Sequence, residues 1–141
     1  MRRRLAAAGA LAAVVGLAAF SAACSSGSGA GSSSTTVTVT LDEYSIETDA
    51  ATAPRGPVTF DVRNAGVEGH NLLIIRTALA PDSLPVHGSV ASEEGSVGKT
   101  DVLAADDEGS LTVDLEPGVY VLICNVSDHY RAGMFAPFTV A

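Results

Sequence analysis

Residues 110–124 read Ser110-Leu-Thr-Val-Asp-Leu-Glu-Pro-Gly-Val-Tyr-Val-Leu-Ile-Cys124. The first six residues alternate between polar and apolar side chains, which is the pattern of a strand with one face in water. Glu116-Pro-Gly118 predicts a tight turn. The residues that follow are apolar on both faces, so they predict a strand in the centre of a sheet. This central strand ends on Cys124.

Short segments of the same kind recur from residue 36 onward, with turns containing Gly or Pro between them. Such spacing predicts an all-β Greek-key β-sandwich, here of seven to eight strands. Residues 77–100 are interrupted repeatedly by Pro and Gly, which predicts loops with one short helix or an irregular strand. Residues 44–48 are expected to continue the first strand after a kink. The further predicted strands are 36–41, 44–48, 58–62, 70–75, 100–104 and 135–140.

Residues 1–23 predict a secretory signal. Arg2, Arg3 and Arg4 precede an apolar run that is too short and too rich in Ala and Gly for a membrane span of ~20 residues. Ser21-Ala-Ala-Cys24 resembles a bacterial lipoprotein signal, in which the cysteine becomes the lipidated first residue. Ser21 departs from the usual Leu or Val, and an ordinary secretory signal is the alternative. We therefore expect an exported protein anchored through Cys24 to the outer face of the bacterial cell membrane.

Residues 24–36 are almost entirely Ser, Gly, Thr and Ala, which predicts a flexible tether to a domain formed by residues 37–141. Without residues 1–23 the chain has five Lys and Arg against 16 Asp and Glu, a net charge of −11. This charge argues against nucleic acid as a partner, because phosphate binding needs basic side chains. It favours a soluble monomer.

The chain has two cysteines, Cys24 and Cys124. If Cys24 carries lipid, Cys124 is the sole thiol in an oxidising compartment, and it should be buried or bound to a metal. A Cys24–Cys124 disulfide is the competing interpretation, but it would fasten a tether to a loop.

Metal-binding side chains follow Cys124. His129 and Met134 come after it with four residues in each gap, and His70 begins a strand upstream. Two imidazoles, a thiolate and a thioether are the donors of a mononuclear electron-transfer copper site, since sulfur favours Cu(I) and imidazole supports Cu(II). Each residue alone has an ordinary interpretation as a core or surface side chain, and only their joint occurrence predicts a site. His87, the remaining histidine, is expected to be exposed and not to bind metal.

The two segments together resemble the cupredoxins, the family of plastocyanin and azurin, over residues 37–140. The motifs that carry the resemblance are Asn64-x-Gly66-x-x-x-His70-Asn71 and Cys124-x4-His129-x4-Met134, with Gly133 before the methionine. The resemblance implies a Greek-key sandwich with one type 1 copper ion that cycles between Cu(I) and Cu(II). His70, Cys124 and His129 would be the equatorial ligands, and Met134 the axial ligand.

The resemblance also implies that the Asn71 side chain hydrogen-bonds across to the loop of Cys124 and so joins the two ligand segments. One pair of residues departs from the family pattern. Many cupredoxins have Pro-Gly just before the second histidine, whereas this chain has Ser127-Asp128. Asp128 places a carboxylate beside a ligand, so the rigidity of the loop and the redox potential do not follow from the resemblance.

The sequence thus predicts a membrane-tethered copper protein that carries single electrons to and from a redox partner it does not identify. The alternative is an extracytoplasmic protein for copper storage, delivery or tolerance. A protein that releases Cu(I) would tend to have a Met-rich site, whereas this chain has one Met after residue 23, which favours the carrier. We do not expect an enzyme, since no second metal cluster or paired nucleophile and base accompanies the four ligands.

Overall fold

The computed structural model of the protein describes residues 34–141, and the part described contains eleven strands and no helix. The predicted all-β sandwich is therefore confirmed. The strands are β1 (Thr35–Asp42), β2 (Ser45–Thr48), β3 (Thr52–Ala53), β4 (Gly56–Asn64), β5 (Leu73–Arg76), β6 (Val86–His87), β7 (Val90–Ala91), β8 (Ser96–Lys99), β9 (Glu108–Leu115), β10 (Gly118–Ile123) and β11 (Phe135–Val140).

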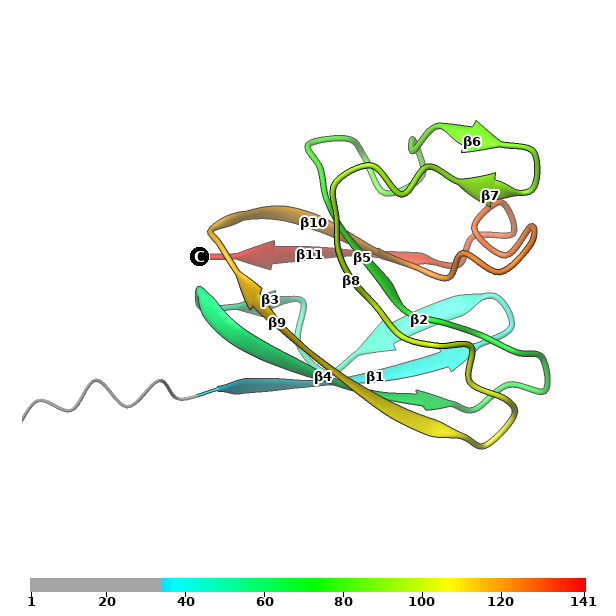
Figure 1. Cartoon of the computed structure of the whole chain (residues 1–141), viewed down its shortest axis with the longest axis horizontal. Coiled ribbons are helices and arrows are strands. Elements are labelled where there is room, and N and C mark those ends of the chain that lie inside the picture. Colours follow the sequence, from blue (N-terminus) through cyan, green and yellow to red (C-terminus); the bar gives the residue numbers. More distant parts are fainter. Residues whose placement is uncertain (1–33) are drawn as a thin grey trace, which may run out of the picture. The chain divides into compact units, whose positions relative to one another are not determined.

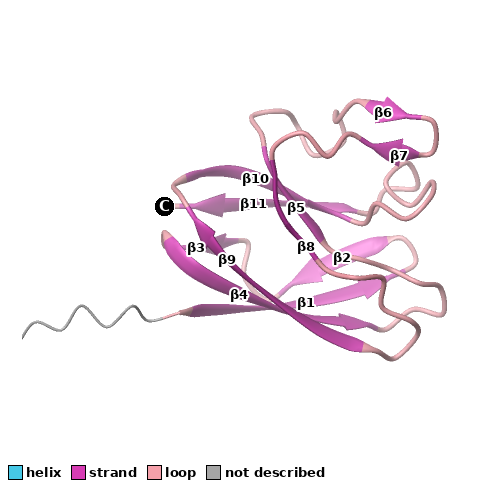
Figure 2. Ribbon diagram, viewed as in Figure 1, coloured by secondary structure: helices cyan, strands magenta, loops and turns pink. Residues whose placement is uncertain are grey.

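The strands form two main sheets that pack face to face (Figure 1). One sheet has four strands in the order β2-β1-β4-β9, and the other has five in the order β3-β11-β10-β5-β8. The β6–β7 hairpin stands apart as a third, two-stranded sheet. Figure 2 shows that long loops gather at one end of the sandwich. The start of β1 and the C-terminus lie at the other end (Figure 1).

The main core lies between the two sheets and follows from strand alternation. Every second residue of β1 and β4 is buried, and these side chains meet those of β10 and β11. Phe60 from the four-stranded sheet meets Phe138 from the five-stranded sheet edge to face, with ring centroids 5.4 Å apart. Apolar side chains at alternate positions therefore hold the two layers together.

A second apolar cluster covers the outer face of the five-stranded sheet. Leu73 and Ile75 of β5 and Val121 and Ile123 of β10 pack there with buried side chains from the loops, namely Leu84, Ala91 and Tyr130. Strand β10 pairs with β11 on one side and β5 on the other, so both its edges and most of both its faces are covered. The sequence prediction of a central strand is confirmed, and its cause is this double cover.

The structure has more strands than the seven to eight that we expected, because β3, β6 and β7 have two residues each and leave no periodic pattern. Residues 44–48 do not continue the first strand. They turn back as β2, which pairs antiparallel with β1. Residues 77–100 hold β6, β7 and β8 and no helix. Within residues 100–104, Leu103 makes a single bridge to His70.

The predicted secretory signal, residues 1–23, and Cys24 lie outside the described residues. Most of the predicted tether does too, and β1 begins at Thr35, two residues before the predicted start of the domain. Across residues 34–141 no helix is long and apolar enough to cross a membrane.

Replacing Phe60 with Ala should destabilise the domain by ~3–5 kcal/mol, because it empties a fully buried position at the contact between the sheets. Urea unfolding of the purified domain measures this change. Val119→Ala is the matched control: this β10 side chain is 51% exposed, so its change should stay within ~0.5 kcal/mol. Equal losses in the two variants would contradict the assigned core.

Candidate metal centre

Three predicted ligands meet at the end of the sandwich where the long loops gather. The Sγ atom of Cys124 lies 3.8 Å from Nδ1 of His70 and 3.5 Å from Nδ1 of His129. The two Nδ1 atoms are 3.1 Å apart. All three residues are buried. Residues far apart in the sequence are thus brought into one compact donor triangle.

Cys124 and His129 are placed by β10 and the loop that follows it. Cys124 comes directly after the last residue of β10, and its backbone N–H donates to the carbonyl of Met134 at 3.1 Å. The N–H of Met134 in turn donates to the carbonyl of His129 at 3.1 Å. Met134 is fully buried in the main core. These hydrogen bonds close the loop, and they fix the backbone positions from which the thiol, imidazole and thioether side chains extend.

His70 lies ahead of β5 rather than within a strand. Its backbone N–H donates to the carbonyl of Leu103 at 3.1 Å, and the N–H of Leu103 returns a hydrogen bond of 2.8 Å. The turn before it is held by Asn64, whose side-chain amide donates to the carbonyls of Glu68 and Leu103. Two-sided pairing thus fixes the backbone of this ligand without a regular strand.

Asn71 joins the two ligand segments. Its side-chain carbonyl accepts a hydrogen bond from the backbone N–H of Asn125 at 2.9 Å. Its own backbone N–H points to the sulfur of Cys124 at 3.5 Å. The structure thus contains the cross-link that the sequence resemblance implied. The contact to sulfur also favours a thiolate, since it places a donor against negative charge.

Burial raises the pKa of the Cys124 thiol, and this effect outweighs the N–H groups of Asn71 and Val126, which lower it. A thiol that is hard to ionise by itself binds metal by giving up its proton to the solvent. The two N–H groups then offset part of the cost of keeping the sulfur charged in a buried place.

Each histidine also contacts a carboxylate through its other ring nitrogen. Nε2 of His70 lies 3.2 Å from Glu43, and Nε2 of His129 lies 3.1 Å from Glu68. The pKa of Glu43 is lowered to about 2, chiefly by the hydrogen bond that it accepts from the backbone N–H of Glu68. An ionised carboxylate only accepts hydrogen bonds, so it places the ring proton on Nε2.

These contacts create a conflict that a cation removes. With protons on both Nε2 atoms, neutral rings direct two Nδ1 lone pairs at each other across 3.1 Å. One positive charge between them, a proton or a metal ion, resolves the conflict. A point in the plane of the three donor atoms lies about 2.0 Å from each, close to ordinary metal–nitrogen distances. The triangle therefore fits a single metal ion.

The donor types fit copper. Two imidazoles and one thiolate, with the thioether of Met134 on the same loop, are the set found in trigonal copper sites with a weak axial ligand. Within residues 34–141, Cys124 is the free cysteine, so the thiolate has no competing disulfide. The centre thus has the composition and the spacing of a type 1 copper site.

Comparison with known proteins agrees with this geometry. No protein-family model matches the sequence, and no curated protein matches it either. A reduced auracyanin from the photosynthetic bacterium Roseiflexus castenholzii is similar over 77% of this chain and 98% of its own, with 26% identity and a TM-score of 0.58. The chain has the cupredoxin fold, and its His-Cys-His site fits a type 1 copper site.

Two further solved structures share the cupredoxin fold. An azurin from Methylomonas sp. strain J matches at 16% identity with a TM-score of 0.58, over 77% of this chain and 98% of its own. Rusticyanin from Thiobacillus ferrooxidans matches at 20% identity with a TM-score of 0.60, over 77% of this chain and 79% of its own. These neighbours are electron carriers rather than enzymes, and they bind one type 1 copper ion.

Asn125 is a residue of the metal centre that the sequence did not reveal. Its side chain accepts from the N–H of Ala91 at 2.8 Å and donates to the Ala91 carbonyl at 3.1 Å and to Glu93 at 3.0 Å. The N–H of Asp128 donates to the carbonyl of Ser89 at 2.7 Å. The β6–β7 hairpin and its flanks therefore brace the ligand loop, as Figure 1 shows.

This bracing bears on Ser127-Asp128, where many cupredoxins have Pro-Gly. The Asp128 side chain is exposed and lies 3.4 Å from Arg131, and its backbone has a positive φ of 65°. The carboxylates that contact the ligands are those of Glu43 and Glu68, which no sequence motif marks. The ligand loop is held by its hydrogen bonds to the β6–β7 hairpin.

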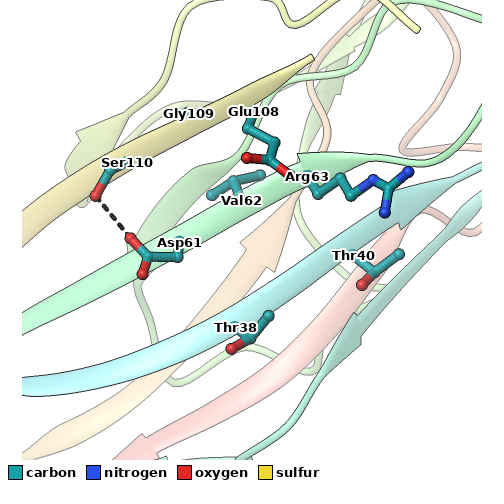
Figure 3. Close-up of a pocket in the computed structure, with 8 residues that line it drawn as sticks. All are labelled: Thr38, Thr40, Asp61, Val62, Arg63, Glu108, Gly109 and Ser110. Carbon is teal, nitrogen blue, oxygen red and sulfur yellow. Dashed lines mark hydrogen bonds between the residues drawn. The ribbon is translucent and has the colours of Figure 1, made fainter. Parts of the chain in front are cut away.

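His87 is exposed on β6 and is not part of the metal-binding cluster. A separate hollow of about 730 Å³ lies over β1, β4 and β9 on the outer face of the four-stranded sheet (Figure 3). It contains a hydrogen bond of 2.9 Å between Ser110 and Asp61. Its lining has neither His nor Cys, so it offers no ligand of the kind that copper prefers. The residues that line it are Thr38, Thr40, Asp61, Val62, Arg63, Glu108, Gly109 and Ser110.

Metal binding should release the Cys124 proton, so the apparent affinity for copper should rise with pH, by roughly tenfold per unit below the pKa of the thiol. The sign follows from the raised pKa: the protonated thiol prevails at neutral pH and competes with the metal. Titrations at several pH values measure the slope. In Cys124→Ser, the number of protons released per metal ion bound, which this slope gives, should fall by one. An affinity independent of pH would contradict a thiolate ligand.

Proposed function

We propose that this cupredoxin carries single electrons through one copper ion held by His70, Cys124, His129 and Met134. The observation that supports it most is the buried triangle in which two imidazole lone pairs and one sulfur converge. Copper bound there would supply one-electron chemistry by cycling between Cu(I) and Cu(II). The protein's own part is to hold donors that suit both oxidation states.

Rigidity supports transfer of electrons over release of the metal. His70, Cys124 and Met134 are fully buried. The backbone of His70 exchanges hydrogen bonds with Leu103, and the backbones of Cys124 and Met134 are joined by another. Fixed donors move little when the charge on the ion changes, which favours fast electron exchange. A delivery protein needs a site from which the ion leaves readily, and burial opposes that.

His129 is the ligand nearest the surface. It is 7% exposed, and its ring contacts the exposed side chains of Tyr44 and Glu68. Electrons would enter and leave most directly through this imidazole, since the other ligands are covered by protein. The acidic surface would steer a basic redox partner toward the domain.

Attachment to a membrane is a further part of the proposal. The sequence of residues 1–23 and the position of Cys24 favour export and lipidation. An extracytoplasmic location also suits a buried thiol that is protected by a metal. We infer that the domain works at the outer face of a bacterial membrane.

Addition of Cu(II) to the purified domain should give an intense blue or green thiolate absorption, because Cys124 would donate charge to the ion. The absorption should disappear in Cys124→Ser and persist in His87→Ala, a control that removes an exposed histidine outside the centre. A colourless protein would contradict the proposal. So would ready loss of Cu(I) to a competing chelator, which would favour copper delivery.

Replacing Cys24 with Ala should move the protein from the membrane fraction to the soluble extracytoplasmic fraction, because the site of lipid attachment is lost. Fractionation and the mass of the mature N-terminus measure this. Ser25→Ala is the control and should leave the protein in the membrane. Wild-type protein found soluble, with an ordinary cleaved N-terminus, would contradict lipidation while leaving the copper proposal intact.

A further inference from the structure

We propose that Glu43 is a positioning residue that orients His70 and, through the charge of its carboxylate, favours Cu(II) over Cu(I) in the centre. This inference rests on the proposed copper function. Glu43 lies in the turn between β1 and β2, and it reaches a ligand that precedes β5 of the other sheet. The two residues are 27 positions apart in the sequence.

A single oxygen of Glu43 accepts three hydrogen bonds. Its Oε1 atom lies 2.8 Å from the N–H of Val67, 2.7 Å from the N–H of Glu68 and 3.2 Å from Nε2 of His70. The two backbone donors come from the turn that leads into His70. They hold the carboxylate in place whether or not the imidazole donates to it, so the carboxylate is organised before any metal binds.

Gly66 makes this close approach feasible. A Cβ atom at this position would collide with the Glu43 carboxylate. Its own N–H donates to the side chain of Asn64 at 2.9 Å. The turn is therefore shaped around the carboxylate.

The consequence for His70 is twofold. A fixed acceptor at Nε2 selects the tautomer with a bare Nδ1 and sets the plane of the ring, so that Nδ1 faces Cys124. A negative charge at this distance also makes the imidazole a stronger electron donor. Stronger donation stabilises the more highly charged Cu(II), which lowers the reduction potential.

Glu68 holds an analogous position at His129, but its surroundings differ. Its side chain is 48% exposed, whereas that of Glu43 is 25% exposed. Glu68 also shares its Oε2 atom with the hydroxyl of Tyr44 at 3.3 Å. Water screens an exposed charge. Glu43 should therefore affect the centre more strongly than Glu68.

The test compares Glu43→Gln with Glu47→Gln, which removes the same charge from an exposed position on β2. In the copper-loaded protein, Glu43→Gln should raise the reduction potential and weaken Cu(II) binding by about 10–100-fold, with a smaller change for Cu(I). Glu68→Gln should cause a smaller rise, and Glu47→Gln almost none. Equal potentials in Glu43→Gln and Glu47→Gln would overturn the proposal.

A second measurement uses the copper-free protein and so separates this inference from the copper function. Nitrogen NMR should show a His70 Nε2–H group protected from exchange in the wild type and in Glu47→Gln. Protection should be lost in Glu43→Ala. If His70 stays protected there, the positioning role is wrong. If the wild type shows protection but gives no coloured copper complex, the copper function fails while the positioning role stands.

Discussion

The centre depends on the antiparallel pairing of β5 with β10. The register sets Leu73 opposite Ile123, so the residues just beyond the paired strands, Asn71 and Asn125, come opposite each other. Asn71 then continues the pairing with its side chain where the backbone ladder ends. A slip of one residue would turn every side chain of β5 to the other face and separate His70 from Cys124. Two apolar clusters, one on each face of this sheet, keep the register fixed.

The strand register brings the ligands together, and the charged groups around the histidines then set where the ring protons lie. Two carboxylates draw the ring protons outward to Nε2, and the lone pairs that remain point inward at a sulfur whose proton is held by burial. The space between the two Nδ1 atoms and the sulfur is therefore lined by lone pairs, with too few protons to pair with all of them. A soft cation satisfies all three donors at once, and the folded chain is arranged for it in advance.

Local pattern was enough to predict the fold class, because alternation in β1, β4 and β9 reflects burial of one face. The spacing of Cys124 and His129, joined to His70, was enough to predict the three donors that converge, and Met134 stays a predicted fourth ligand. Glu43, Glu68 and Asn125 could not be predicted in the same way. Their roles arise from turns and a hairpin that approach across the fold, and the strands β6 and β7 that carry this bracing are too short to leave a periodic signal.

The first strand also determines at which end of the sandwich the chain enters the domain. β1 enters at the end of the sandwich that holds the C-terminus and runs parallel to β4, whose last residue, Asn64, begins the turn to His70. Eight strand residues span roughly 25 Å, so the chain enters about that far from the ligands. Any surface that holds the protein by its N-terminal segment is joined to the pole opposite the histidines. The histidines therefore lie at the end of the domain farther from the point where the chain enters it.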